Sequence, residues 1–344
     1  MRATSPAQYA AFELGAVPPV EQLRDGVWSI PNPMPGQSNG LTSTLCYLIE
    51  GGDGALHLID PGLGHDAGYD AVADGIARTG HAVSELASIV VTHLHTDHLG
   101  LAARLRAESG ASLVLHRREQ WAIDHADELG TPLDAQLLDE WGVPAERRAE
   151  LLAVPSTAGH PVAPIRADVL VDGGGELPIA GRRLRVVDTP GHTPGSMSLV
   201  DDESELVFTG DALLPTIHPG IGLGGTVSNP VGDYLRSLRT LEEHDDYEAC
   251  PGHEFRFTEV ASRCRTTGEH QLRRSREVAA AVVDSPEATV WQLASRLHWT
   301  AGFAQLRDFY LRSALAQTQM HLDFVRSPAA AEFLTPASAA PVDA

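Results

Sequence analysis

The chain has 344 residues, of which 43% are hydrophobic and 21% are charged, and its formal net charge at pH 7 is −21. This length and composition are typical of a globular protein with one large domain and an accessory segment, and the negative charge disfavours nucleic acid, which proteins bind mainly through Lys and Arg. The three cysteines, Cys46, Cys250 and Cys264, lack CxxC spacing, which argues against a disulfide framework and a thiolate zinc site, so we expect a cytoplasmic protein.

The first part of the chain is expected to be mainly β-structure. Residues 1–24 read as an N-terminal extension, and short strands are predicted at 26–30, 44–50 and 55–60, separated by loops rich in Pro, Gly and Asn. Residues 65–80 have apolar side chains at helical spacing, and a further strand follows at 86–93. No stretch reaches the roughly 18 consecutive apolar residues of a membrane helix, so no membrane partner is expected.

The middle of the chain predicts mixed α/β structure. A helix at 100–110 and a strand at 111–116 complete a strand–helix–strand unit with parallel pairing. Residues 117–165 form an acidic helical insertion, which is either a lid over an active site or a surface helical pair. Hairpin-like strands are predicted at 170–187, a strand at 206–214 and a helix at 230–244.

The C-terminal part reads as helical from about residue 269. We expect a catalytic domain at 25–265, a C-terminal helical module at 266–330 and a disordered tail at 331–344, where Ala and Pro are frequent.

The stretch "THLHTDH", residues 92–98, indicates a metal site. His93 and His95 are two residues apart, so on an extended backbone both imidazoles point the same way and can bind one ion. Asp97 and His98 follow the strand end, where the backbone can turn them toward a second ion. The alternative is a polar loop in which Asp97 caps the next helix.

Three further candidate ligands each lie near the end of a predicted strand. They are His192 in "TPGHTPG", Asp211 in "FTGDALL" and His253 in "CPGHE". A lone residue of this kind is more often structural, but together with residues 92–98 they make a set of five His and two Asp. Such a set suits Zn²⁺, and also Fe or Mn.

Five motifs in this order resemble those of the metallo-β-lactamase superfamily: "LIDPG" (58–62), "THLHTDH" (92–98), "DTPGHTPGS" (188–196), "FTGDALL" (208–214) and "PGHE" (251–254). The resemblance implies an α/β (α+β) fold, the four-layer αββα sandwich, carrying the helical insertion and the C-terminal module. It also implies a site for two Zn²⁺ ions. By this resemblance His93, His95 and His192 would bind the first ion, Asp97, His98 and His253 the second, and Asp211 both, while Asp60 would orient a ligand imidazole.

The resemblance further implies a hydrolase in which metal-bound hydroxide cleaves a carboxylic ester, thioester or lactone, with Asp97 as one possible proton donor. The commonest true β-lactamases resemble this chain but carry Cys in place of Asp211, so the glyoxalase II-like and thioesterase- or lactonase-like branches fit better. Oxygen-reducing diiron relatives generally carry Glu in place of His95. A phosphodiesterase of the same fold and a mononuclear-iron persulfide dioxygenase remain alternatives, whereas a non-enzymatic regulator would be expected to have lost ligands.

The sequence narrows the substrate only to a small molecule. Trp121, Trp141, Leu137 and Leu138 of the insertion either line a pocket for an acyl group, as in acyl-CoA, or pack the helices. The C-terminal helices resemble a winged-helix-like module seen in some relatives, but their basic residues are few, which favours packing over DNA binding. A homodimer is compatible with these features.

Overall fold

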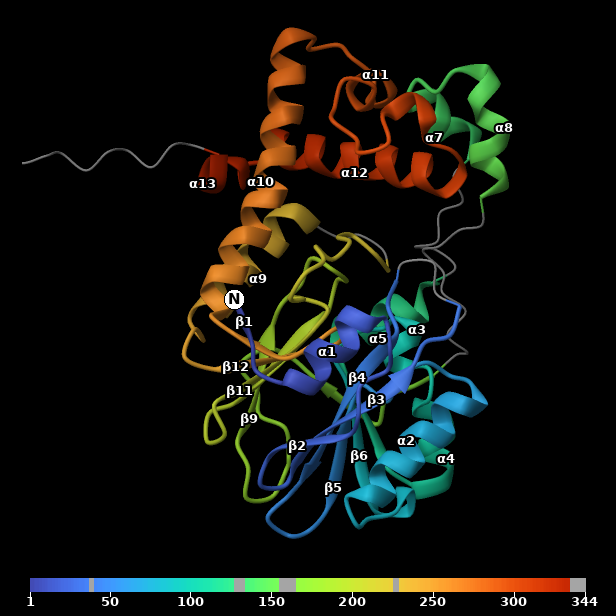
Figure 1. Ribbon diagram of the computed structural model, residues 1–344. Helices are drawn as coiled ribbons and strands as arrows, with labels where there is room; N and C mark the ends of the chain where they lie inside the picture. The colour runs from blue at the N-terminus through green and yellow to red at the C-terminus, as the bar shows by residue number, and fades with distance from the viewer. Residues whose placement is uncertain (37–39, 127–133, 155–164, 225–228, 335–344) are drawn as a thin grey trace, which may run out of the picture. The chain divides into compact units, whose positions relative to one another are not determined.

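The computed structural model describes residues 1–36, 40–126, 134–154, 165–224 and 229–334 (Figure 1). The chain divides into two compact units: unit 1 comprises Met1–Leu129 and Ala158–Thr267, and unit 2 comprises Gly130–Thr157 and Gly268–Ala344. Among the helices described, none is both long and apolar enough to cross a membrane.

Unit 1 contains two β-sheets. The seven-stranded sheet has the order β2-β3-β4-β5-β6-β7-β8, with bounds β2 Glu21–Arg24, β3 Val27–Pro33, β4 Ser43–Glu50, β5 Leu56–Ile59, β6 Leu86–Val91, β7 Ser112–His116 and β8 Val169–Val171. The six-stranded sheet has the order β1-β13-β12-β11-β10-β9, with bounds β1 Arg2–Ala3, β9 Leu184–Asp188, β10 Met197–Asp201, β11 Leu206–Gly210, β12 Glu248–Pro251 and β13 Phe257–Thr258.

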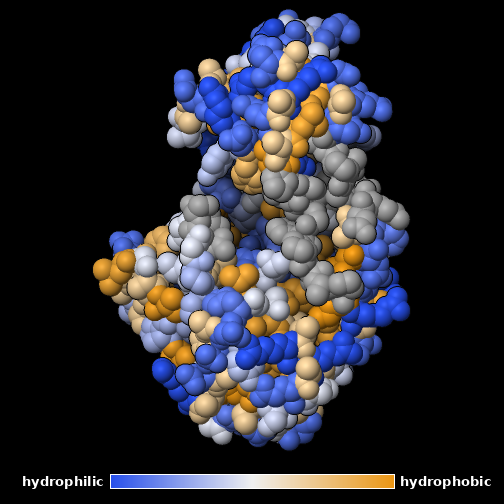
Figure 2. All heavy atoms as spheres, turned by 90° about the vertical axis from the view of Figure 1, so that its right-hand side faces the viewer, coloured by the Kyte–Doolittle hydropathy of each residue, from blue (hydrophilic) through white to orange (hydrophobic). Residues whose placement is uncertain are grey.

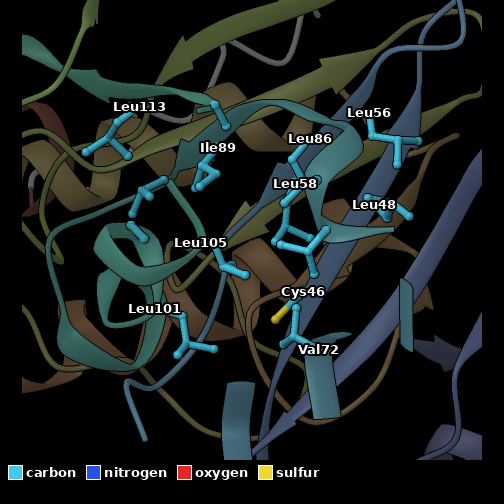
Figure 3. Close-up of a cluster of buried hydrophobic side chains, with 14 of the residues drawn as sticks. Cys46, Leu48, Leu56, Leu58, Val72, Leu86, Ile89, Leu101, Leu105 and Leu113 are labelled. Carbon is cyan, nitrogen blue, oxygen red and sulfur yellow. The ribbon is translucent and has the colours of Figure 1, made fainter. Parts of the chain in front are cut away.

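The central strands of the seven-stranded sheet are apolar at nearly every position, and their side chains are buried on both faces of the sheet. On β4, Cys46 and Leu48 join one buried cluster while Leu45 and Tyr47 join another, as alternation along a strand requires. The first cluster (Figure 3) packs the outer helices on this sheet, and the second also contains Phe208 and other residues of the six-stranded sheet. The two sheets therefore face each other across a shared core.

Helices cover the outer faces of the two sheets, which completes the predicted αββα sandwich (Figure 1). The helices of unit 1 are α1 Pro6–Leu14, α2 Asp66–Arg78, α3 Thr96–Leu99, α4 Ala102–Ser109, α5 Arg117–Asp124 and α9 Pro230–Glu242, with a 3-10 turn at Val83–Glu85. Val72 and Ile76 of α2 and Leu105 of α4 pack on the seven-stranded sheet. Helix α10, Val260–Asp284, begins in unit 1 and continues into unit 2.

Two details of unit 1 differ from the sequence-based expectation. Residues 1–24 are part of the fold, because β1 pairs with β13 and β2 pairs with β3. The two strands at the ends of the segment 170–187 belong to different sheets, because β8 pairs with β7 and β9 pairs with β10. Between them the predicted hairpin is present as a short antiparallel turn: Leu177 N–H donates to the carbonyl oxygen of Leu184 at 2.8 Å, and an isolated bridge joins Glu176 and Arg185.

Unit 2 is helical in the part that the structure describes. Its remaining helices are α7 Ala135–Glu140, α8 Ala145–Ala153, α11 Val290–Ala294, α12 Asp308–Arg326 and α13 Ala330–Leu334, with a 3-10 turn at Phe303–Gln305. Asp134 caps α7, and Thr289 forms a capping box with Gln292 at α11. No strand occurs among these described residues, so they contain no β-hairpin of a winged helix.

The segment expected to be a single insertion at 117–165 is divided between the units. Helix α5 belongs to unit 1, whereas α7 and α8 share an apolar cluster with the C-terminal helices, because Leu138, Trp141 and Leu151 pack with Val278 and Leu293. Part of the tail predicted as disordered is also helical, since α13 covers Ala330–Leu334; residues 335–344 lie outside the described residues.

Hydrophobic and hydrophilic side chains are mixed on the face of unit 1 that Figure 2 shows. Single exposed apolar residues of this kind are normal for a globular protein and mark no interface by themselves.

Candidate metal centre

The residues predicted as ligands lie at the carboxyl ends of strands. Strands β5 and β6 run parallel, as do β11 and β12, so the segments that follow them emerge at the same edge of each sheet. Residues 92–98 follow β6, His192 lies between β9 and β10, Asp211 follows β11 and His253 follows β12. The fold thus brings together side chains that are up to 160 residues apart in sequence.

Three histidines form the first donor group. The Nδ1 atom of His95 lies 3.0 Å from Nε2 of His93 and 3.0 Å from Nε2 of His192. All three side chains are buried. This is the trio that the resemblance assigned to the first ion, and its donor atoms are close enough to bind one metal.

Asp97, His98 and His253 form the second donor group. Nε2 of His98 lies 3.3 Å from Nε2 of His253, which lies 3.4 Å from Asp97 Oδ2. Asp97 does not cap a helix, because α3 begins at Thr96 with His95 at its N-cap. Its carboxylate is instead directed to His253, and these three residues could also hold a metal ion.

Asp211 lies between the two groups. Its Oδ2 is 3.8 Å from His192 Nε2, while its Oδ1 is 3.4 Å from His98 Nε2 and 3.5 Å from His253 Nε2. The close approach of the β12 turn requires glycine at position 252, where a Cβ would lie 2.6 Å from Asp211 Oδ1. The "PGHE" motif thus contributes a small residue as well as a candidate ligand.

Hydrogen bonds fix which nitrogen of each imidazole faces the site. Nδ1 of His192 lies 2.6 Å from the carbonyl oxygen of Gly220, and Nδ1 of His253 lies 2.9 Å from that of Ser43. A carbonyl oxygen only accepts hydrogen bonds, so both Nδ1 atoms must carry a hydrogen and donate it in a hydrogen bond. The Nε2 atom of each ring then faces the other candidate metal ligands. This is the arrangement that a ligating imidazole needs.

Asp60 orients two further imidazoles, that of His98 directly and that of His93 through Thr92. Its carboxylate accepts hydrogen bonds from Thr92 N–H and Thr92 Oγ1, both at 2.7 Å, and from His98 Nδ1 at 2.9 Å. Because the Thr92 hydroxyl donates to Asp60, it accepts from Nδ1 of His93, 3.1 Å away. Asp60 has φ 52°, a conformation rare outside glycine and tolerated better by Asp and Asn than by most residues.

The two groups differ in electrostatics. Burial and the neighbouring imidazoles of His98 and His95 lower the pKa of His93 well below its usual value, and burial lowers that of His192. Burial acts in the same direction at His253, but the carboxylates of Asp211 and Asp97 together outweigh it and raise the pKa of His253 to about 10.

The carboxylates of the site remain ionised. Burial alone would raise the pKa of Asp97, but His98 and His253 lower it below its usual value. Asp211 behaves in the same way, its pKa being lowered by His253 and His98 against the effect of burial. In the second group the carboxylates raise the pKa of His98 and His253, and these imidazoles lower the pKa of the carboxylates in return.

This donor set fits metal ions. In the first group the lone pair of His93 Nε2 and that of His192 Nε2 both face His95 Nδ1, and one proton on that atom cannot satisfy both. Two nitrogens bound to a tetrahedral zinc at about 2.0–2.1 Å lie about 3.3 Å apart, close to the observed separations. Neutral imidazoles and carboxylates are suitable ligands for zinc, iron and manganese.

Sequence reasoning missed several residues that hold the ligands. Thr92 was quoted only as part of its motif, and the carbonyl groups of Ser43 and Gly220 carry no sequence signal. Glu119 on α5 was missed altogether, although it is fully buried and bonds to the loops that carry ligands.

Comparison with known proteins places the chain in a family. Residues 39–253 match the family model described as the metallo-beta-lactamase superfamily, so the chain belongs to this superfamily. It is 26% identical over 301 residues to the "Beta-lactamase-like protein 2 homolog" of Caenorhabditis elegans, covering 86% of this chain and 85% of that protein.

Two further relatives extend this result. The chain is 23% identical to the "Atrochrysone carboxyl ACP thioesterase" of Aspergillus chevalieri, over 85% of this chain and 80% of that protein. Among solved structures, a metallo-beta-lactamase family protein from Thermus thermophilus superposes with a TM-score of 0.68 at 28% identity, covering 89% of this chain and 94% of that one. Membership of the superfamily indicates a metal-dependent hydrolase.

Proposed function

We propose that this protein is a two-metal hydrolase that cleaves a carboxylic ester, thioester or lactone, with a thioester as the first candidate. The observation that carries the proposal is the position of Asp211 between two donor groups, with one carboxylate oxygen directed to each. In this proposal His93, His95 and His192 bind one ion, Asp97, His98 and His253 bind the other, and Asp211 contacts both.

Two zinc ions, or iron or manganese, would activate water near neutral pH and polarise the carbonyl group of the substrate. The residues of the chain orient these ions, because backbone carbonyls and the Asp60–Thr92 pair fix four of the imidazoles. As a ligand, Asp97 enters the reaction as a carboxylate, because a carboxyl group must lose its proton to bind a metal. It can therefore pass a proton to the leaving group only after accepting one from the attacking water.

Side chains that could attack the substrate directly are engaged elsewhere. Ser196 is buried, and its Oγ lies 2.6 Å from Oγ1 of Thr193, whose N–H it also accepts. Cys250 lies in the core between the sheets, where burial raises the pKa of its thiol well above the usual value. Neither has the free, activated side chain of a nucleophile, which supports water as the attacking group.

The preference for a thioester rests on a relative and not on a pocket. The relative from Aspergillus chevalieri is named as a thioesterase. Of the residues suggested for an acyl pocket, Leu138 and Trp141 instead pack the helices, because both are buried in the apolar cluster of unit 2. Trp121 is 38% exposed, and its ring stacks on that of His125 in the same segment.

The proposal is tested by metal analysis together with a substrate panel. Protein reconstituted with zinc should contain two ions per chain and hydrolyse acyl-CoA thioesters, p-nitrophenyl esters or lactones in preference to bis-p-nitrophenyl phosphate. Preference for the phosphodiester would favour the alternative phosphodiesterase. One iron per chain with oxygen uptake on a persulfide would overturn the hydrolase assignment.

A further inference from the structure

Glu119 is a fully bonded buried carboxylate that neither the motifs nor the proposed reaction accounts for. It lies near the start of α5 and is fully buried. Its Oε2 accepts a hydrogen bond of 2.6 Å from the N–H of Leu94, while its Oε1 accepts from Gly195 N–H at 2.6 Å and from Thr193 Oγ1 at 2.9 Å. One side chain therefore bonds to two separate loops.

These two loops carry the first donor group. Leu94 lies between His93 and His95 in the loop after β6, and Thr193 follows His192 in the loop between β9 and β10. The loops belong to different sheets, since β6 is in the seven-stranded sheet and β9 is in the six-stranded sheet. The distance between His95 and His192 thus depends on how the two sheets are connected at this edge.

The residues around Glu119 pack closely against the segment that carries His192. At Gly195 a Cβ would lie 2.7 Å from the backbone nitrogen of Glu119 and 2.7 Å from Nδ1 of His116, so only glycine allows this approach. His116, at the N-cap of α5, also reaches the other sheet, with Nε2 3.0 Å from Asp188 Oδ1 at the end of β9. The start of α5 therefore contacts both the loop that carries His192 and the end of the strand before it.

Glu119 cannot itself be a ligand in this arrangement. Its three partners all donate, and both carboxylate oxygens accept at least one hydrogen bond. The Thr193 hydroxyl, having donated to Glu119, accepts from Ser196 Oγ 2.6 Å away, so the protons of this network are accounted for. The carboxylate is held by donors and directed to the loops, not to the metal.

We propose that Glu119 is the positioning residue of the first donor group: it fixes the loop of His93 and His95 against the loop of His192, and so sets the affinity of the first metal ion. The proposal rests on the proposed two-metal function and deepens it. The second donor group is held by Asp60 and Ser43, so it does not depend directly on Glu119.

The test compares Glu119→Gln with a matched control in the same helix. In Glu119→Gln an amide N–H₂ replaces one acceptor oxygen and must face a donor. Asp124→Asn alters a carboxylate on α5 that bonds within the helix, to Gln120. Metal-free protein is titrated with Zn²⁺ against a chromophoric chelator, and with Co²⁺ while its visible absorption is recorded.

In Glu119→Gln we expect one zinc to bind about 10–100-fold more weakly, which is the usual effect of losing a residue that orients ligands. The second zinc should bind as in the parent. The Co²⁺ absorption that is lost should match the absorption lost in His192→Ala and not that lost in His253→Ala. Asp124→Asn should bind both ions as the parent does.

Two results would overturn the inference. Glu119→Gln with both affinities unchanged shows that the carboxylate does not position the loops, and equal weakening of both ions together with lower thermal stability shows a general structural role. If Glu119→Gln does not fold, Thr193→Val, which removes one donor to Glu119, should weaken the same ion about 10-fold, and an unchanged affinity there is equally decisive. If the parent protein binds zinc at only one site, that result contradicts the two-metal function but not the role of Glu119. If the parent protein binds no zinc, both proposals are overturned.

Discussion

Unit 1 and unit 2 bury polar side chains in different ways. In unit 1, histidines and carboxylates converge at one edge of the sheets, and the groups of three potential ligands found among the described residues all lie there. The described helices of unit 2 enclose an apolar cluster around Leu293, Leu311 and Leu315, and its buried His321 bonds to Ser275 of the neighbouring helix. The contrast assigns the chemistry to unit 1, whereas the side chains of unit 2 account for its own stability.

The largest effect should come from Asp211 in unit 1. In Asp211→Ala both donor groups lose a shared carboxylate, so we expect weaker binding of both metals and a fall in kcat/KM of about 1000-fold or more, equivalent to roughly 4 kcal/mol of transition-state stabilisation. Metal content and hydrolysis of the best substrate from the panel measure this. Asp66→Asn, which changes an exposed carboxylate, is the control, and a variant that retained both metals and activity would refute the shared role.

In unit 2 the corresponding large effect is on stability alone. Leu293 is fully buried in the apolar cluster, so Leu293→Ala should lower the free energy of unfolding of unit 2 by about 2–5 kcal/mol. Denaturant titration followed by tryptophan fluorescence is suited to this, because Trp141, Trp291 and Trp299 lie in unit 2.

Val283→Ala supplies the control for this experiment, since Val283 lies on α10 in the same unit and is 79% exposed. Its effect should stay below about 0.5 kcal/mol. Metal content should be the same as in the parent for both variants. A loss of metal in Leu293→Ala would contradict the separation of chemistry and stability between the units.

The same contrast explains what the sequence could predict. Candidate ligands such as His192 and His253 were found because each follows an apolar strand at a Pro-Gly turn, and strand ends of an α/β fold meet at one edge. The partners of these ligands were not found: Gly220 and Ser43 act through carbonyl groups, which any residue has. Glu119 is one of many acidic residues in a helix, and only the tertiary structure shows that it meets both loops.

The sequence was less informative about unit 2 for a related reason. The apolar spacing around Leu138 and Trp141 predicted helices, and the helices are present. Periodicity shows which face of a helix is buried but not which element covers it. The insertion was therefore expected to belong to the catalytic domain, whereas its helices α7 and α8 pack with helices more than 100 residues further along the chain.

A smaller effect is expected from Asp60, which orients ligands without being one of the proposed ligands. Asp60→Asn keeps the shape and tolerates the positive φ, but its amide group must face one of three donors, so metal affinity and activity should fall about 10–100-fold. Glu205→Gln is the matched control, because Glu205 is an acidic residue with φ 54° that is exposed. If both variants bind zinc like the parent, Asp60 does not orient the imidazoles.

The smallest effect concerns the buried histidine of unit 2. Burial, with a lesser contribution from the charges of Arg274 and His270, lowers the pKa of His321 to about 3, whereas in the unfolded chain it is about 6.5. Between these values the unfolded chain binds more protons than the folded one, so stability is lost as the pH falls from about 6.5 toward 3. From pH 7 to pH 5 this single residue should remove up to about 2 kcal/mol.

His321→Gln tests this, because glutamine can still bond to Ser275 but does not titrate. The unfolding of unit 2, followed by tryptophan fluorescence at pH 5 and pH 7, should depend less on pH in His321→Gln than in the parent. His298→Gln, which alters an exposed histidine of the same unit, should retain the full dependence. Equal acid sensitivity of the parent and both variants would mean that His321 is not held neutral in the folded protein. The contrast between this buried neutral histidine and the raised pKa of His253 in unit 1 would then fail.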